Sequence, residues 1–90
     1  MGDVIHNSAN SRFEIVIGGA TAKLEYTLDG ERMIIHHTFV PTELRGQNIA
    51  GKLAAAAFDY SRNEGLKVVP QCSYIEVYAK RHPEVADLMA

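Results

Sequence analysis

The sequence predicts an α+β domain in which a three-stranded antiparallel meander continues into a β-α-β unit. Two turn signals, Gly18-Gly19 and Asp29-Gly30, divide residues 12–40 into three segments with alternating apolar residues. After Pro41 the apolar period changes from 2 to 3.6, which indicates a helix. A short apolar segment, 66–69, follows this helix, and such a crossover makes its two strands parallel.

We expect the three strands of the meander at residues 12–17, 20–28 and 31–40. Two-residue loops at both turns would set the register. The expected pairs are Ile15 with Ala22, Tyr26 with Met33, and Ala22 with His37. One face of this sheet is then largely apolar, and a helix must cover it. The residues on this face are Phe13, Ile15, Ile17, Leu24, Tyr26, Met33, Ile35, His37 and Phe39.

The covering helix is predicted at residues 47–64 and should stop at Gly65. Its inner face combines Ile49, Leu53, Ala56, Ala57 and Tyr60. Phe58 lies opposite, where it can meet the C-terminal segment or a second subunit. A capping box, Ser73 with Glu76, starts a second helix that runs to about residue 80. A last helix, 84–89, follows Pro83.

Composition limits the class of protein. The 90 residues are 47% hydrophobic and 22% charged, which is typical of one globular domain. We expect a loose leader at residues 1–11 and a single domain at 12–90. The net charge of −2 argues against nucleic acid as a partner, and no apolar run is long enough for a membrane span. With one cysteine and no secretory signal, we expect a cytoplasmic protein; no metal site is predicted.

The loop at residues 44–52 is the first candidate site. Ligands of parallel β-α-β units bind at the carboxyl ends of the strands, where this loop enters the helix. Gly46, Ala50 and Gly51 are small enough for a ligand to approach the backbone. Free helix N–H groups and Arg45 favour a phosphate there. The alternative is an ordinary turn with a close helix-to-sheet contact.

The same loop, Arg45-Gly46-Gln47-Asn48-Ile49-Ala50, resembles the R/Q-x-x-G-x-G/A pyrophosphate motif of the GNAT acyl-CoA N-acyltransferases. Residues 13–90 resemble their compact YjdJ-type subgroup, through His37-Thr38, Val40-Pro41, Val69-Pro70-Gln71-Cys72, Tyr78 and Arg81-His82-Pro83-Glu84. The resemblance implies a minimal GNAT fold. It departs from the pattern at Asn48, which replaces a glycine. Full-size GNAT enzymes have further segments that form a wall around the acceptor site, and this chain is too short to contain them. The acceptor site should therefore be open or completed by a partner.

The resemblance implies acetyl-CoA as the co-substrate. Its pantetheine arm would pair with backbone groups at the end of the third strand, and its pyrophosphate would meet the amides of 46–50, with Arg45 assisting. Lys52 would reach the adenosine phosphates, or it is simply a solvated helix lysine. The expected cofactor-binding residues are Phe39, Val40, Arg45, Gly46, Gln47, Asn48, Ile49, Ala50, Gly51 and Lys52.

Cys72 and His37 are the candidate catalytic residues. Cys72 precedes the predicted cap Ser73, and a helix N-terminus lowers the pKa of a thiol. Its thiol can accept the acetyl group or protonate the departing CoA thiolate; alternatively, Cys72 packs on Val77 as a hydrophobic staple. His37 is either a general base for an incoming amine or a buried core histidine.

These residues support two classes of function. The first is an acyl-CoA-dependent N-acetyltransferase that acts on a primary amine, and an open acceptor site favours a peptide or protein amine. The second is a CoA-binding module without substantial catalysis, as a sensor or as an interaction protein that uses the face of Phe58.

Overall fold

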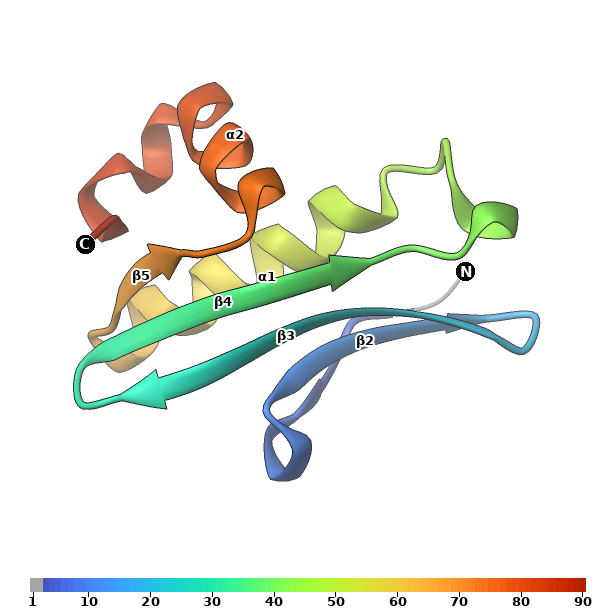
Figure 1. Cartoon of the computed structure of the whole chain (residues 1–90), viewed down its shortest axis with the longest axis horizontal. Helices are drawn as coiled ribbons and strands as arrows, with labels where there is room; N and C mark the ends of the chain where they lie inside the picture. Colours follow the sequence, from blue (N-terminus) through green and yellow to red (C-terminus); the bar gives the residue numbers. More distant parts are fainter. Residues whose placement is uncertain (1–2) are drawn as a thin grey trace.

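The computed structural model describes residues 3–90 and contains one five-stranded sheet in the order β1-β2-β3-β4-β5 (Figure 1). The first four strands are antiparallel, and β4 and β5 are parallel. The predicted α+β class and β-α-β unit are therefore confirmed. The elements are β1 (Ile5–Asn7), η1 (Ser8–Asn10), β2 (Arg12–Ile17), β3 (Ala20–Asp29), β4 (Arg32–Phe39), η2 (Thr42–Leu44), α1 (Ile49–Glu64), β5 (Lys67–Pro70), α2 (Ser73–Arg81) and η3 (Pro83–Leu88), where η marks a 3-10 helix.

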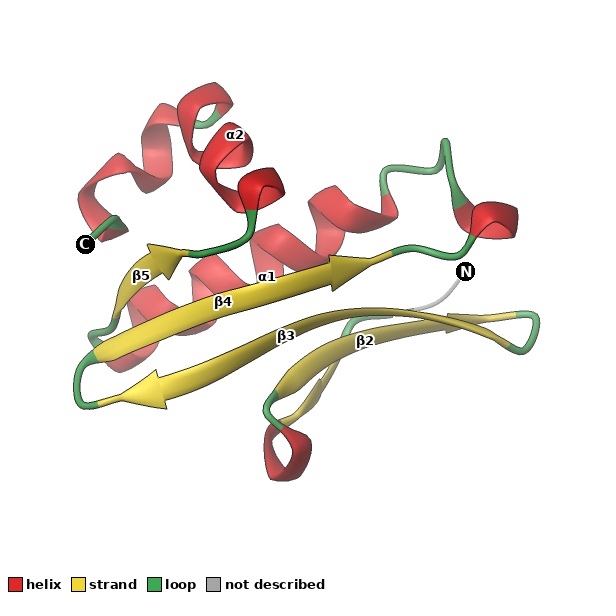
Figure 2. Cartoon of the chain, viewed as in Figure 1, coloured by secondary structure: helices red, strands yellow, loops and turns green. Residues whose placement is uncertain are grey.

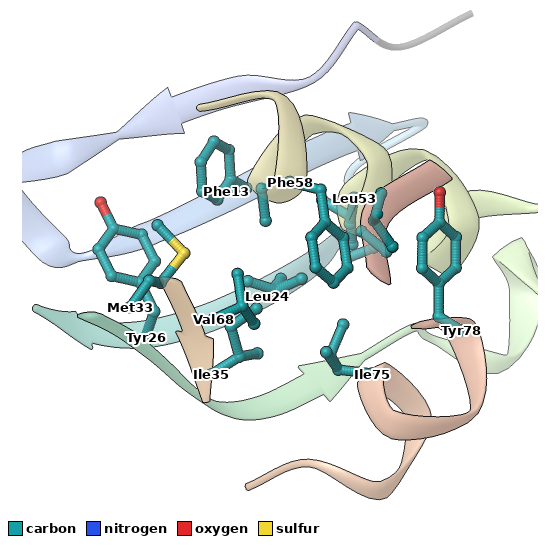
Figure 3. Close-up of a cluster of buried hydrophobic side chains, with 14 of the residues drawn as sticks. Phe13, Leu24, Tyr26, Met33, Ile35, Leu53, Phe58, Val68, Ile75 and Tyr78 are labelled. Carbon is teal, nitrogen blue, oxygen red and sulfur yellow. The ribbon is translucent and has the colours of Figure 1, made fainter. Parts of the chain in front are cut away.

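Helix α1 covers one face of the sheet, and the opposite face is left open (Figure 2). Leu53 and Ala57 of α1 are buried against the sheet, as predicted. Phe58 is also buried, and its ring stacks on Tyr78 of α2 at a centroid distance of 5.6 Å (Figure 3). The partner of Phe58 is thus the C-terminal segment, which was one of the two expected options. Within residues 3–90, no helix combines the length and the apolar character that crossing a membrane requires.

The register between β2 and β3 agrees with the prediction, whereas that between β3 and β4 does not. Ile15 lies opposite Ala22, but Tyr26 lies opposite Ile35 instead of Met33. The cause is the turn: Asp29 pairs with Arg32, so the loop residues are 30 and 31. The β4 residue opposite each β3 residue is thus shifted by two positions. Because side chains alternate between the faces with a period of two, this shift leaves each of them on its predicted face, and Met33 and Ile35 are both fully buried.

A β-bulge changes the second half of β4. Between the pairs Tyr26–Ile35 and Glu25–His37, His36 is an extra residue on β4. One extra residue reverses the alternation of side chains. His37 and Phe39, which were predicted on the apolar face, therefore lie exposed on the open face, with Phe39 43% exposed. Placing His37 on the apolar face was wrong because the alternation of residues contains no signal for the bulge.

The segment predicted as a loose leader contains strand β1, which pairs with β2 through residues 5–7. One side chain explains why so short a strand docks. The His6 ring stacks on Phe13 at 4.1 Å, and its Nε2 lies 2.6 Å from the hydroxyl of Tyr26. Tyr60 of α1 meets the same ring edge-on at 4.5 Å. Residues 1 and 2 of the predicted leader lie outside the described residues.

The contact of His6 predicts a pH dependence of stability. Burial lowers the pKa of His6 below its ordinary value of 6.5. As the pH falls below 6.5, the unfolded chain takes up a proton that the folded chain does not, so folding becomes less favourable. We expect the melting temperature to fall between pH 6.5 and the lower folded pKa.

His6→Phe is the matched control, because it keeps an aromatic ring against Phe13 but does not titrate. Its melting temperature should fall less over the same pH range than that of the unsubstituted protein. Equal pH slopes for the two proteins would contradict this role of His6.

Candidate functional site

The candidate site lies where β4 and β5 separate. Their parallel pairing ends at Ile35 and Pro70. One further backbone hydrogen bond joins the two segments at this point: the Cys72 N–H donates to the Ile35 carbonyl at 3.0 Å. Strand β4 continues to Phe39, and within residues 3–90 no strand pairs with this last part of its outer edge. The result is a forked sheet with a free backbone edge at residues 36–39.

Cys72 lies at this fork, one position nearer to α2 than predicted. It is itself the N-cap of α2, and its carbonyl accepts the N–H of Ile75 at 3.1 Å. The capping box at Ser73 was therefore wrong by one residue. The hydrophobic staple is excluded with it, because the two staple positions are now Gln71 and Glu76, which are polar.

The thiol of Cys72 faces β4. It donates to the Thr38 hydroxyl at 3.7 Å, and the Cys72 side chain is half-buried. Thr38 belongs to the free edge and points away from the open face because of the bulge. The structure therefore brings the predicted cysteine together with a threonine that sequence reasoning did not select, although Thr38 follows His37 directly.

The loop before α1 contains two residues with left-handed backbone conformations. Gly46 has φ +83°, and Asn48 has φ +58° in the left-handed region. Asn48 occupies the N-cap position but makes no side-chain cap bond, so it leaves the first N–H groups of α1 free. The Arg45 Nε donates to the Val40 carbonyl at 3.3 Å, which ties the loop back to the end of β4. The side chain of Gln47 is exposed, and that of Ile49 is buried.

Two adjoining hollows extend from this loop. One of about 170 Å³ lies beside Val40 and the loop, and one of about 320 Å³ lies between α1 and α2. Asn48, Gly51 and Tyr74 line both. The residues that line the first are Val40, Leu44, Arg45, Gly46, Asn48, Ile49, Ala50, Gly51 and Tyr74. The second is lined by Asn48, Gly51, Lys52, Ala55, Tyr74, Val77, Tyr78, Arg81 and His82.

The second hollow has positive charge at its rim and neutral tyrosines in its wall. Lys52 and Arg81 are exposed cations that line it. Burial raises the pKa of the Tyr74 and Tyr78 hydroxyls, so both remain protonated at neutral pH. The place of Tyr74 between both hollows could not be inferred from sequence, because it depends on how α2 packs against α1.

The two histidines of β4 lie on the open face, away from the thiol. His37 is exposed, with its ring 6.5 Å from that of Phe39. His36 Nδ1 lies 3.3 Å from Gln71 Oε1, and its Nε2 lies 2.5 Å from the Thr27 hydroxyl. His37 and Cys72 therefore flank the free edge of β4 from opposite faces.

Comparisons with known proteins agree in pointing to one family. Residues 12–88 match the family described as GCN5-related N-acetyl-transferase. The chain is 37% identical to Protein NATD1 of Mus musculus over an alignment of 83 residues, and this alignment covers 89% of this chain and 76% of that protein. Identity and coverage are the same with Protein NATD1 of Gallus gallus. The NMR solution structure of a GCN5-like protein from Staphylococcus aureus superimposes with a TM-score of 0.78 at 25% identity, over 98% of this chain and 87% of that one.

Proposed function

Because the chain belongs to the GCN5-related N-acetyltransferase family, we propose that it transfers an acetyl group from acetyl-CoA to a primary amine. The observation that carries this proposal is the fork between β4 and β5. Its free backbone edge leads directly into the loop at residues 45–50 and the two hollows. A long, thin ligand with a diphosphate in its middle fits that sequence of surfaces.

The residues along this path match the parts of CoA in order. The edge at His37–Phe39 offers unpaired backbone groups to the amides of the pantetheine arm. The free N–H groups of residues 46–50 and the guanidinium of Arg45 suit the diphosphate. Lys52 and Arg81 at the second hollow suit the phosphate on the ribose. Acetyl-CoA would supply the activated acetyl group.

Cys72 is the residue that we propose for the chemistry. Its sulfur attacks the acetyl carbonyl carbon, forming a new C–S bond while the C–S bond to CoA breaks, and its proton passes to the CoA sulfur. The amine nitrogen then attacks the same carbon, the bond to Cys72 breaks, and a proton from the amine restores the thiol. The thiol at the fork, hydrogen-bonded to Thr38, supports this assignment.

The acceptor amine would approach from the open face of the sheet. Helix α1 and the core fill the other face, whereas Phe39 and His37 are exposed. The imidazole of His37 lies on that face, across the β4 edge from the thiol, and would take a proton from the incoming ammonium group before the amine passes the edge to reach the acetyl group. An open face without a surrounding wall favours an amine on a peptide or protein.

The first test is binding. At 100 times its Kd, CoA should stabilise the fold by about 2.7 kcal/mol, which raises the melting temperature by about 10–20 °C for a domain of this size. Adenosine should do much less because it lacks the diphosphate. Gly46→Glu should abolish the shift, since it puts a negative side chain at the expected diphosphate position.

Gly30→Glu is a matched control for this variant. Both glycines have positive φ and open space around them, but Gly30 lies at the far end of β4. It should lose stability and keep the full CoA shift. A folded protein that shows no shift at millimolar CoA would contradict the proposed site.

The second test concerns the thiol. After mixing with acetyl-CoA, the intact mass should increase by one acetyl group, and hydroxylamine should remove it. Cys72 is the only cysteine, so the site of a thioester is unambiguous. Cys72→Ser should bind CoA with little change in affinity but lose acetyl transfer by at least about 100-fold.

Undiminished transfer by Cys72→Ser would reject the thioester route and leave direct attack by the amine on acetyl-CoA. Binding without transfer to polyamines, lysine peptides or N-terminal amines, in the unsubstituted protein, would favour the alternative of a CoA-binding module.

A further inference from the structure

Little backbone attaches the turn that carries Cys72 to β4. In the part of the chain that the structure describes, the backbone of Gln71 and Cys72 bonds to β4 at one point only, the Ile35 carbonyl. The Gln71 N–H instead donates back to a carbonyl of β5 at 3.2 Å. Strand β5 and the buried Ile75 of α2 hold the two ends of the turn. Between these ends, the direction of the Cys72 thiol depends on side-chain contacts.

His36 supplies such a contact from the open face. Its Nδ1 lies 3.3 Å from Gln71 Oε1, and its Nε2 lies 2.5 Å from the Thr27 hydroxyl. The Gln71 oxygen can only accept a hydrogen bond, so Nδ1 carries the proton, and in a neutral ring Nε2 then accepts from the Thr27 O–H. One imidazole therefore links β3 to the turn between β5 and α2, across β4.

The β-bulge makes His36 available for this link. His36 is the extra residue on β4, so no residue of β3 pairs with it. A bulge can re-aim a side chain, and here the ring reaches back to Thr27, which pairs with Ile34. The imidazole therefore lies over the base of the fork, where the pairing of β4 with β5 ends.

We propose that His36 is a positioning residue for Cys72: its hydrogen bond to Gln71 holds the turn against β4, so that the thiol stays at the free edge beside Thr38. This inference rests on the proposed function, in which that thiol receives the acetyl group. The Cys72 thiol donates to Thr38 on the face opposite His36. Side chains on both faces of β4 thus hold two successive residues of the turn.

The structural part of the proposal is tested without CoA. His36→Phe keeps an aromatic ring but loses both hydrogen bonds, and Gln71→Met keeps the length of the side chain but loses the acceptor. In the folded protein, each change should speed alkylation of Cys72 by iodoacetamide about threefold, because a loosened turn exposes the half-buried thiol. Exchange of the Cys72 amide should also become faster.

Two comparisons assign these effects to the bond between His36 and Gln71. The double variant should match either single variant, because both changes remove the same contact. His37→Phe is the matched control for the thiol, since His37 lies on the same face and makes no bond to Gln71; it should leave alkylation unchanged. Additive effects of the two changes, or unchanged alkylation in both, would overturn the proposal.

The chemical part is tested with acetyl-CoA. In His36→Phe and Gln71→Met, capture of the acetyl group by Cys72 should slow by at least about fivefold, because the thiol is displaced from its line of attack. The Kd for CoA should stay within about twofold, since neither side chain lines the two hollows. Faster alkylation together with slower acetyl capture identifies a misplaced thiol, because a thiol that had lost its reactivity would be slower in both reactions.

Acetyl capture at the unsubstituted rate in both variants would overturn the positioning role and leave the proposed function intact. Slowing of both reactions together would also overturn it. If the unsubstituted protein captures no acetyl group, the thioester route fails, whereas alkylation and amide exchange still decide whether His36 holds the turn.

Discussion

Backbone pairing between β4 and β5 ends at Ile35, and the rest of the candidate site depends on this early end. Pro70 closes β5 and carries no N–H to continue the ladder. The next N–H in reach is that of Cys72, which bonds the Ile35 carbonyl and turns the chain into α2. Beyond Ile35, β4 stays paired with β3 on one side, whereas its other edge is free and has the thiol beside it. One interruption in the hydrogen bonding therefore creates the fork, fixes the cysteine and sets where α2 begins.

Much of the fold followed from patterns that reflect burial on one face. The alternation in β2 and β3 and the 3.6-residue period of α1 predicted these three elements and the pairing of Ile15 with Ala22. The features that were not predictable are those that local sequence leaves undecided. Residues 36 and 37 are both histidine, so nothing in the local sequence marks His36 as the extra residue of a bulge. Strand β1 is held by one aromatic cluster around His6, which only the tertiary structure assembles.

The candidate site shows the same division. The loop at residues 45–50 could be selected from its small residues, Gly46 and Ala50, and from its place between a strand and a helix; the structure places it beside both hollows. Cys72 was predicted on an incorrect cap; the observed cap excludes the staple with Val77, while Cys72 still packs against the core. Tyr74 and Thr38 were missed because their importance depends on the packing of α2 and on the bulge. The contact of His36 with Gln71 is likewise visible only when both are in place.

The free edge of β4 is the central claim of this account, and amide hydrogen exchange with and without CoA tests it most directly. We predict that CoA slows exchange at residues 36–40 and at 46–50, since both segments would gain hydrogen-bond partners. Amides of the β2–β3 hairpin around Gly18, which lies outside the proposed site, should change only as far as global stability does. Unchanged exchange at 36–40 in a protein saturated with CoA would contradict the account.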